Sequence, residues 1–193
     1  MRRWALQKWV RLRSRLRRLW YPILFPGLRI GTGVLLEKGV RFDIPRGGMI
    51  EIGDGCHIEP YCNLGAAGHL SIGPRAFIGF GSILSASECV VIGDDALIAA
   101  YCVIRDQDHG TEAYPYRKQP SRTAPIRIGK NVWLGSHVTV LKGAVIGDNA
   151  IIGAGAVVTR SISPGATAVG VPARQLSKAA LPGADQAGEA SDR

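Results

Sequence analysis

The chain has 193 residues, enough for one sizeable domain and a small appendage, and two independent domains are not expected. Its formal net charge of +9 would suggest a nucleic-acid partner if the charge were spread over the whole chain. However, eight of the 24 basic residues and none of the 15 acidic residues lie in the first 20 positions, which leaves 16 basic against 15 acidic residues elsewhere. The body is therefore nearly neutral, no nucleic-acid partner is expected, and the basic character belongs to the N-terminus.

Residues 1–27 are predicted to form a basic amphipathic helix and a linker. The apolar residues recur at intervals of three and four and share one helical face: Ala5, Trp9, Leu12, Leu16, Leu19 and Trp20. Most of the arginines lie elsewhere on the wheel, and Pro22 ends the pattern. Such a helix can lie on an anionic membrane surface, or its apolar face can pack on the protein or on another subunit. The sequence leaves both alternatives open.

No targeting or membrane-spanning segment is expected. An uninterrupted apolar core, which a secretory signal requires, does not follow the N-terminal charges. No stretch reaches the roughly 20 apolar residues of a spanning helix, because Pro22 and Pro26 interrupt the best candidate. We therefore expect a cytoplasmic protein that could rest peripherally on the inner face of the membrane.

Residues 28–176 carry a repeat of six residues. An aliphatic residue recurs at every sixth position, at Ile128, Leu134, Val140, Ile146, Ile152 and Val158. A small or β-branched residue lies four positions after each of them. Upstream, sets of three such hexapeptides begin at Ile52, Ile72 and Ile92. This period is too short for a helical repeat and is typical of a parallel β-helix, in which three hexapeptides form one triangular coil. The sequence predicts an all-β prism of six to seven coils.

Three of the four cysteines fit this pattern as core residues. Cys56, Cys62 and Cys102 stand where neighbouring repeats carry small buried residues. No CxxC pair suggests zinc or redox chemistry. Beyond the repeat, residues 177–193 are small, polar and without period, and they are predicted to be a disordered tail.

The segment from Ile104 to Ile128 interrupts the repeat. Ile128 lies 24 positions after Ile104, the length of four hexapeptides, so the repeat resumes in phase. The positions where aliphatic residues would be expected hold Gly110, Tyr116 and Arg122 instead, and three prolines intrude. The segment therefore predicts a protruding loop near residues 105–125, inserted at a corner of the prism.

The stretch "IRIGKNVWLGSHVTVLKGAVIGDNAIIGAGAVVTRSISPGATAVGVPAR", residues 126–174, resembles the hexapeptide-repeat acyltransferases. The likeness is closest to the galactoside, maltose and polysaccharide O-acetyltransferase branch, and it extends over residues 28–176. It implies a left-handed parallel β-helix, an exception to the usual right-handed crossover. It also implies a homotrimer with clefts between neighbouring prisms, and acetyl-CoA as cosubstrate with no metal required.

The same resemblance assigns His109 as the general base. Acetyl transfer to a hydroxyl needs a group that accepts the hydroxyl proton and a donor for the carbonyl oxygen. A neutral imidazole suits the first task. Of the four histidines, only His109 follows the last regular strand before the interruption, beside Asp108 and close to Asp106. The other three are interpreted as wall or corner residues.

The two aspartates have alternative roles. Either Asp106 or Asp108 could orient the imidazole, or either could cap backbone amides of the turn. Asp106 is the preferred orienting residue, because Asp108 holds the nominal inward position of its hexapeptide, where a buried carboxylate would need local partners.

The remaining site residues follow from the resemblance alone. Trp133 resembles the tryptophan that walls the acceptor and thioester region, and the backbone amide of Ser136 resembles the donor to the thioester carbonyl. Ala154 matches the position whose backbone holds the pantetheine arm. The predicted adenine and 3′-phosphate contacts of coenzyme A are Thr159, Arg160 and Arg174, where a guanidinium suits the phosphate. Arg160 stands where relatives commonly have lysine.

We therefore expect an acetyl-CoA-dependent O-acetyltransferase that acts on a saccharide or lipid-linked saccharide in polysaccharide or glycolipid assembly. The first alternative is an N-acyltransferase acting on an amino sugar nucleotide, and residues 110–125 do not decide between the two. A β-helical carbonic anhydrase would need three histidines converging on zinc, and the closely spaced pair of that pattern is missing. A non-catalytic scaffold would have no reason to combine His109, Trp133 and Arg174 in these contexts.

Overall fold

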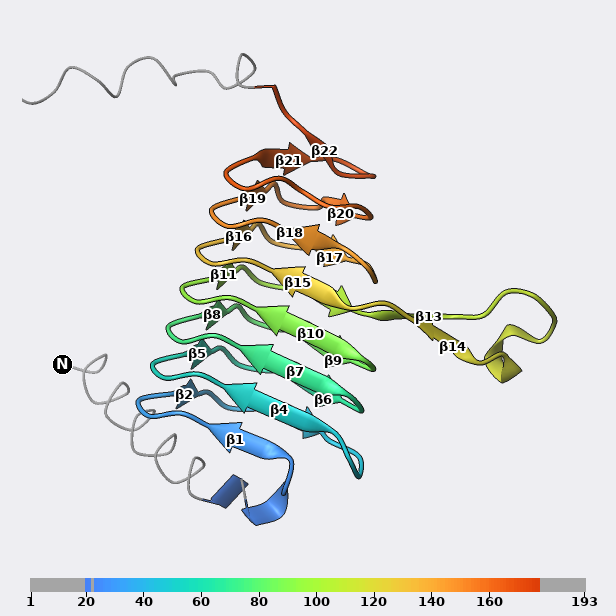
Figure 1. The fold of residues 1–193 in the computed structure, drawn as a ribbon. Coiled ribbons are helices and arrows are strands. Elements are labelled where there is room, and N and C mark those ends of the chain that lie inside the picture. Colours follow the sequence, from blue (N-terminus) through green and yellow to red (C-terminus); the bar gives the residue numbers. More distant parts are fainter. Residues whose placement is uncertain (1–19, 22, 178–193) are drawn as a thin grey trace, which may run out of the picture.

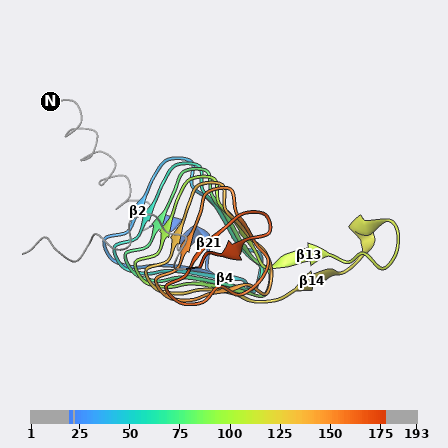
Figure 2. The same cartoon turned by 90° about the horizontal axis from the view of Figure 1, so that it is seen from above.

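The computed structural model describes residues 20–21 and 23–177, which form a stack of triangular coils with one protruding arm (Figure 1). Each regular coil contributes one strand to each of three sheets that run along the stack. Seen along the stack, the coils superimpose as a triangle (Figure 2). The predicted all-β prism, a parallel β-helix, is confirmed. The predicted helix within residues 1–20 and the predicted tail lie almost entirely outside the described residues.

The three sheets are named in the order in which the chain enters them. The first sheet contains β1 (Leu28–Ile30), β4 (Met49–Ile52), β7 (His69–Ile72), β10 (Cys89–Ile92), β15 (Ile126–Ile128) and β18 (Val145–Ile146). The second contains β2 (Leu35–Leu36), β5 (His57–Ile58), β8 (Phe77–Ile78), β11 (Leu97–Ile98), β16 (Trp133–Leu134), β19 (Ile151–Ile152), β21 (Thr167–Val169) and β22 (Arg174–Gln175). The third contains β3 (Arg41–Asp43), β6 (Asn63–Ala66), β9 (Ile83–Ala86), β12 (Val103–Arg105), β17 (Thr139–Val140) and β20 (Val157–Val158). Within these sheets the described strands pair in parallel, except β21 with β22.

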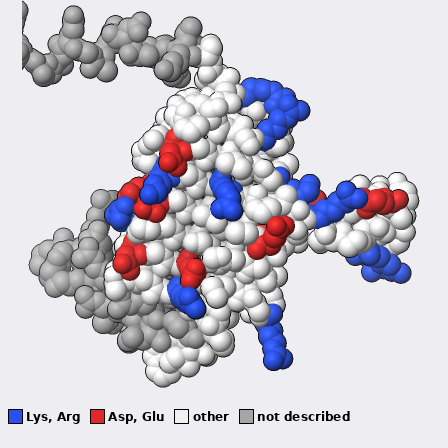
Figure 3. All heavy atoms as spheres, in the orientation of Figure 1, with Lys and Arg blue, Asp and Glu red and all other residues white. Residues whose placement is uncertain are grey.

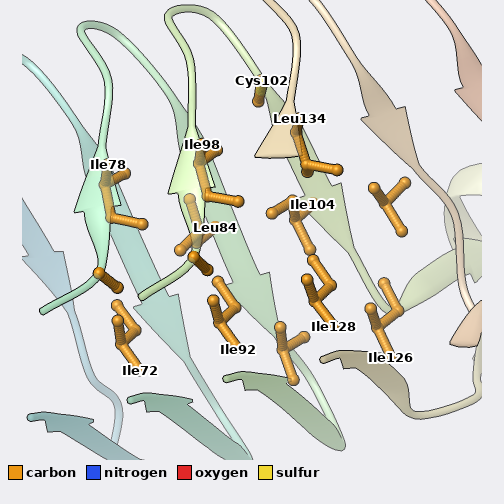
Figure 4. Packing of buried hydrophobic residues seen from close by; sticks show 14 of the residues in the cluster. Ile72, Ile78, Leu84, Ile92, Ile98, Cys102, Ile104, Ile126, Ile128 and Leu134 are labelled. Carbon is orange, nitrogen blue, oxygen red and sulfur yellow. The ribbon is translucent and has the colours of Figure 1, made fainter. Parts of the chain in front are cut away.

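The hexapeptide period sets the register, because each inward aliphatic residue lies directly above its counterpart in the preceding coil. In the first sheet Ile92 lies between Ile72 and Ile128. The same stacking occurs in the other two sheets, and the side chains form one continuous buried core (Figure 4). Fully burying one such side chain contributes about 1.5–3 kcal/mol. The repeated coil therefore creates a core that no single coil could form.

The glycine that follows many inward aliphatic residues allows the coils to stack closely. A Cβ atom built on Gly93 would lie 2.6 Å from the carbonyl carbon of Gly129 in the next coil. No ordinary side chain tolerates such a contact with backbone, so the Ile-Gly pairs of the repeat have a steric cause.

The cysteine prediction is confirmed. Cys56, Cys62 and Cys102 are fully buried among the core side chains, and all three are free thiols. Burial raises the pKa of the Cys62 thiol to about 11. These thiols are therefore protonated core residues at neutral pH and are poor nucleophiles.

The histidines predicted to be wall or corner residues take such positions. His57 contacts Glu37 at 2.8 Å and His69 contacts Glu51 at 2.9 Å, both on outer faces of strands. His137 stacks on Tyr101 with ring centroids 5.1 Å apart. None of the three lies on the protruding arm.

The N-terminal end of the described chain packs against the first coil of the prism. Tyr21 and Phe25 pack against Phe42, with ring centroids 5.6 Å and 6.0 Å from it. Ile23 and Leu24 point away and are 71% and 66% exposed. Within the described part of the chain, no helix is long and apolar enough to cross a membrane.

Candidate active site

The interruption of the repeat forms an arm, residues 106–124, that extends from the edge between the third and first sheets (Figure 2). The predicted protrusion is confirmed, but the arm has more order than a plain loop. Its two sides, β13 (Gln107–His109) and β14 (Ser121–Thr123), pair as an antiparallel ribbon. A short 3₁₀ helix, Tyr116–Lys118, lies in the connection between them. Both signs of charge occur on the arm (Figure 3), and Glu112 forms an ion pair with Arg122.

His109 is the last residue of β13 and lies opposite Ser121. Its side chain is exposed. Within residues 20–21 and 23–177, no hydrogen bond or ion pair involves its imidazole. The ring is therefore free to contact a substrate, and no carboxylate of the described chain orients it.

Asp106 lies at the root of the arm and is fully buried. Its carboxylate accepts hydrogen bonds from the backbone amides of Ser87, Glu88 and Cys89 at 2.7, 2.8 and 2.8 Å. Of the two predicted roles, this geometry corresponds to capping of backbone amides. The prediction that Asp108 faces inward is wrong, because strand alternation continues for two residues past Ile104, so that Asp106 faces inward before the chain leaves the prism.

Asp108 already lies on the arm, with an exposed carboxylate that accepts a 2.6 Å hydrogen bond from Lys142 Nζ. Lys142 follows β17 in the next coil. This ion pair therefore joins the arm to the prism, and no sequence spacing indicated it.

A hollow of about 360 Å³ lies on the outer face of the second sheet. It is lined by residues of β16 and β19 and of the corners that follow β11, β16 and β19: Ala99, Trp133, Gly135, Ser136, Ile151, Ile152, Gly153 and Ala154. Three of the predicted coenzyme-binding residues are among them, so the structure brings Trp133, Ser136 and Ala154 together. The indole of Trp133 is 48% exposed and forms one wall.

Two backbone amides at this hollow are available to a ligand. Corner amides on either side of Ser136 bond to neighbouring coils: Gly135 N–H to Ile152 at 2.8 Å and His137 N–H to Ala100 at 3.0 Å. The amides of Ser136 and Ala154 themselves donate to no acceptor within the described chain. An apolar hollow with two unused N–H donors suits a thioester and the amide-containing arm of coenzyme A.

Comparison with known proteins identifies the repeat. Residues 125–160 match the family model "Bacterial transferase hexapeptide (six repeats)", and residues 69–105 match "Hexapeptide repeat of succinyl-transferase". Galactoside O-acetyltransferase of Escherichia coli (strain K12) is 35% identical over 125 residues, which are 65% of this chain and 62% of that protein. The chain thus spans a little less than two thirds of this relative.

A second relative matches over more of both chains. The protein named "Putative lipopolysaccharide biosynthesis O-acetyl transferase WbbJ", of Escherichia coli (strain K12), is 30% identical over 160 residues, which are 78% of this chain and 71% of that one. The chain belongs to the hexapeptide-repeat acetyltransferase family. Among solved structures, the D94N mutant of AntD, an N-acyltransferase from Bacillus cereus in complex with dTDP and coenzyme A, is similar with a TM-score of 0.67 and 25% identity. The matched region covers 77% of this chain and 82% of the AntD chain.

Three other predicted residues of this hexapeptide-repeat family member do not line the hollow. Thr159 and Arg160 are exposed on the turn after β20, between the third and first sheets. Arg174 is exposed on β22, beyond β19 in the second sheet, and its guanidinium bonds to the carbonyl of Ala173 at 3.2 Å. The side chains that would contact adenine and phosphate are therefore dispersed on a single prism, and their roles stay predictions.

The predicted base and the hollow occupy different sides of this prism. The hollow lies on the second sheet, whereas His109 lies on the arm at the edge between the third and first sheets (Figure 2). One chain therefore does not bring His109 to Trp133. Among the described residues, no group of three His, Cys, Asp or Glu side chains could hold a metal ion.

Proposed function

We propose that this protein transfers an acetyl group from acetyl-CoA to a hydroxyl of a saccharide in polysaccharide or glycolipid assembly. The observation that carries the proposal is the hollow that combines Trp133 with the unused amides of Ser136 and Ala154. The names of the galactoside and lipopolysaccharide relatives support a saccharide acceptor. The thioester end of acetyl-CoA would enter this hollow.

In this mechanism the acceptor hydroxyl attacks the carbonyl carbon of the thioester while His109 accepts the hydroxyl proton. The Ser136 amide donates a hydrogen bond to the carbonyl oxygen as it becomes negative. The intermediate collapses when the carbon–sulfur bond breaks, and the departing sulfur takes the proton from the imidazolium. The products are the O-acetylated saccharide and coenzyme A.

The active site would be shared between subunits of a homotrimer. A cyclic trimer places the same two surfaces in contact around a three-fold axis. The arm of one subunit could then bring His109 to the hollow of its neighbour. This arrangement accounts for the separation of the two features on one prism.

A second candidate is N-acylation of an amino sugar nucleotide. The likeness to AntD, an N-acyltransferase solved with dTDP and coenzyme A, favours it. The two reactions would share the hollow and His109 and would differ only in the acceptor atom.

A screen of acceptors tests the proposal. Purified protein is incubated with acetyl-CoA and with free sugars, sugar nucleotides, amino sugar nucleotides or lipid-linked sugars, and thiol release is measured. We expect release with a neutral saccharide or lipid-linked saccharide and a product whose acetyl group is removed by mild alkali, as an ester is. An alkali-stable product made only from amino sugars would favour N-acylation, and no release with any acceptor would contradict both reactions.

We also propose that the N-terminal end of the prism rests on an anionic membrane surface. Trp20, Ile23 and Leu24 are 62%, 71% and 66% exposed, whereas their neighbours Tyr21 and Phe25 pack on the prism. The eight basic residues of positions 1–20 adjoin this apolar group in sequence. Exposed Trp and Leu side chains beside arginines match the chemistry of a lipid headgroup region.

Vesicle co-sedimentation tests this contact. The double variant Ile23→Ser/Leu24→Ser should bind phosphatidylglycerol vesicles several-fold more weakly than the native protein, and native binding should fall as salt rises. Tyr114→Ser is the matched control, because Tyr114 on the arm is also an exposed apolar residue, at 82%. Equal binding of all three proteins, or no binding of the native protein, would exclude the membrane contact.

A further inference from the structure

At the root of the arm, a side chain accepts the hydrogen bonds that backbone carbonyls accept elsewhere in the stack. In the preceding coil, the amides of Ala67 and Gly68 donate to the carbonyl of Ala86, at 2.9 and 3.1 Å, and thereby join consecutive coils. The corresponding amides one coil later belong to Ser87 and Glu88. They have no equivalent carbonyl above them, because the chain departs into the arm at this point.

The carboxylate of Asp106 takes the place of that missing carbonyl. Asp106 follows Ala66 and Ala86 in the stack, since Ala66 is in register with Ala86 and the Asp106 amide bonds to Ser85 of the same strand. Its two oxygens accept the amides of Ser87, Glu88 and Cys89. Alanine at this position would leave these N–H groups without an acceptor. The chain can therefore leave the prism at this point while all three of these backbone N–H groups keep an acceptor.

Further contacts tie both strands of the arm to the prism. The carbonyl of Asp106 accepts the amide of Ala124, where the arm returns, and the carbonyl of Ala124 accepts the amide of Gly143 in the following coil, both at 3.0 Å. Beside Gly143, Lys142 donates to Asp108 at 2.6 Å. The arm is therefore fixed to the coil before it and to the coil after it.

We propose that Asp106 and the Asp108–Lys142 pair are positioning residues for His109. They act through the backbone of β13, setting the direction in which the arm leaves the prism, and none of them touches the imidazole. His109 lies one residue beyond Asp108, so a change in this direction moves the ring relative to a neighbouring hollow. The inference rests on the proposed function of His109, but its structural part can be tested separately.

Charge reversal tests the ion pair. The single variants Asp108→Lys and Lys142→Asp should each lower kcat about tenfold with the KM for acetyl-CoA unchanged, because neither residue lines the hollow. The double variant should recover most of the lost kcat, since it restores an ion pair of opposite polarity. Arg29→Glu is the matched control, because it breaks an exposed ion pair with Glu51 far from the arm and should leave kcat unchanged.

Hydrogen exchange reports on the arm without requiring activity. Amides of β13 and β14 should exchange several-fold faster in either single variant and return toward native rates in the double variant, while the prism strands are unaffected. Faster exchange in a protein without acetyl transfer would refute the proposed function but uphold the positioning. Unchanged arm exchange and unchanged kcat in the single variants, or a double variant no better than either, would overturn the inference.

Asp106→Asn distinguishes positioning from direct orientation of the imidazole. Asparagine keeps the shape but replaces one acceptor oxygen with an NH₂ group, so kcat should fall and arm exchange should rise. The acidic limb of the pH–rate profile should stay in place, because Asp106 does not contact His109. A shifted limb with native arm exchange would identify Asp106 as an orienting acid instead, and would refute its positioning role.

Discussion

Replacing His109 with alanine is expected to reduce acetyl transfer by about 10²- to 10⁴-fold, the range over which a general base contributes. The imidazole is exposed and makes no hydrogen bond or ion pair within the described chain, so its removal should cost no stability. Steady-state turnover with acetyl-CoA and the acceptor found in the screen gives the effect on kcat. Calorimetry should show unchanged coenzyme binding, since in the proposed mechanism His109 contacts the acceptor hydroxyl, whereas Trp133 and Ser136 hold the coenzyme.

A second histidine provides the control for this loss. His69 lies on the first sheet and contacts Glu51, so His69→Ala removes an imidazole from the surface of the prism without touching the arm. Its turnover should stay within about twofold of the native value. Native turnover in His109→Ala with intact thermal stability would remove His109 from the mechanism.

Two inactive variants are expected to restore activity when their subunits mix. The first is His109→Ala, which lacks the base, and the second is Ala154→Trp, whose new indole fills the hollow. In a trimer with shared sites, a site is native when the arm comes from an Ala154→Trp subunit and the hollow from a His109→Ala subunit. Random assembly of equal amounts makes about one quarter of the sites native, so activity should rise from near zero to about 25%.

Exchange between equal amounts of the two variants allows this measurement on the unsorted mixture. Mixed trimers isolated by two tags should reach about one third of native activity, because each of them holds one native site in three. Val145→Trp is the control for the added indole, because Val145 is exposed on the first sheet, away from the hollow. This variant should remain active by itself. If mixed assemblies recover no activity, the arm of one subunit does not act at the hollow of another. That result would contradict the proposal of an active site shared between subunits.

The periodic part of the fold could be predicted residue by residue, because one physical rule governs it. An aliphatic residue at every sixth position has to face the interior of a triangular coil, and the register of Ile72, Ile92 and Ile128 follows from that rule alone. The cysteines were predictable for the same reason, since their positions within the repeat place them inside. The interruption could be predicted to protrude because Gly110, Tyr116 and Arg122 stand where the period requires aliphatic residues, and three prolines intrude.

The ordered contacts of the arm could not be predicted from the same rule. Nothing in the period shows that Gln107–His109 pairs with Ser121–Thr123, or that Lys142 reaches Asp108. The hexapeptide count predicts Asp108 as the inward residue, but at that position the chain has already left the coil. Strand alternation, counted from Ile104, would have identified Asp106.

The hollow proposed to bind coenzyme A was predictable in part. Ser136 and Ala154 lie at equivalent corners of successive coils, and Trp133 lies on β16 just before the first of these corners, so the repeat itself brings the three together. Thr159, Arg160 and Arg174 lie where the regular coils end, and there the repeat no longer determines which surfaces meet.

Because the Asp106 side chain completes the hydrogen bonding of the coil that the arm leaves, the prism does not depend on the rest of the arm. Every hydrogen bond that the departing chain would have supplied to the turn at Ser87–Cys89 is provided by one side chain at the point of exit. The coils above and below therefore do not depend on what the chain does between Asp106 and Ala124. Arms of other lengths and sequences could be exchanged at this junction, so that the surface presented by the arm could change through evolution or engineering while the prism and its hollow stay the same.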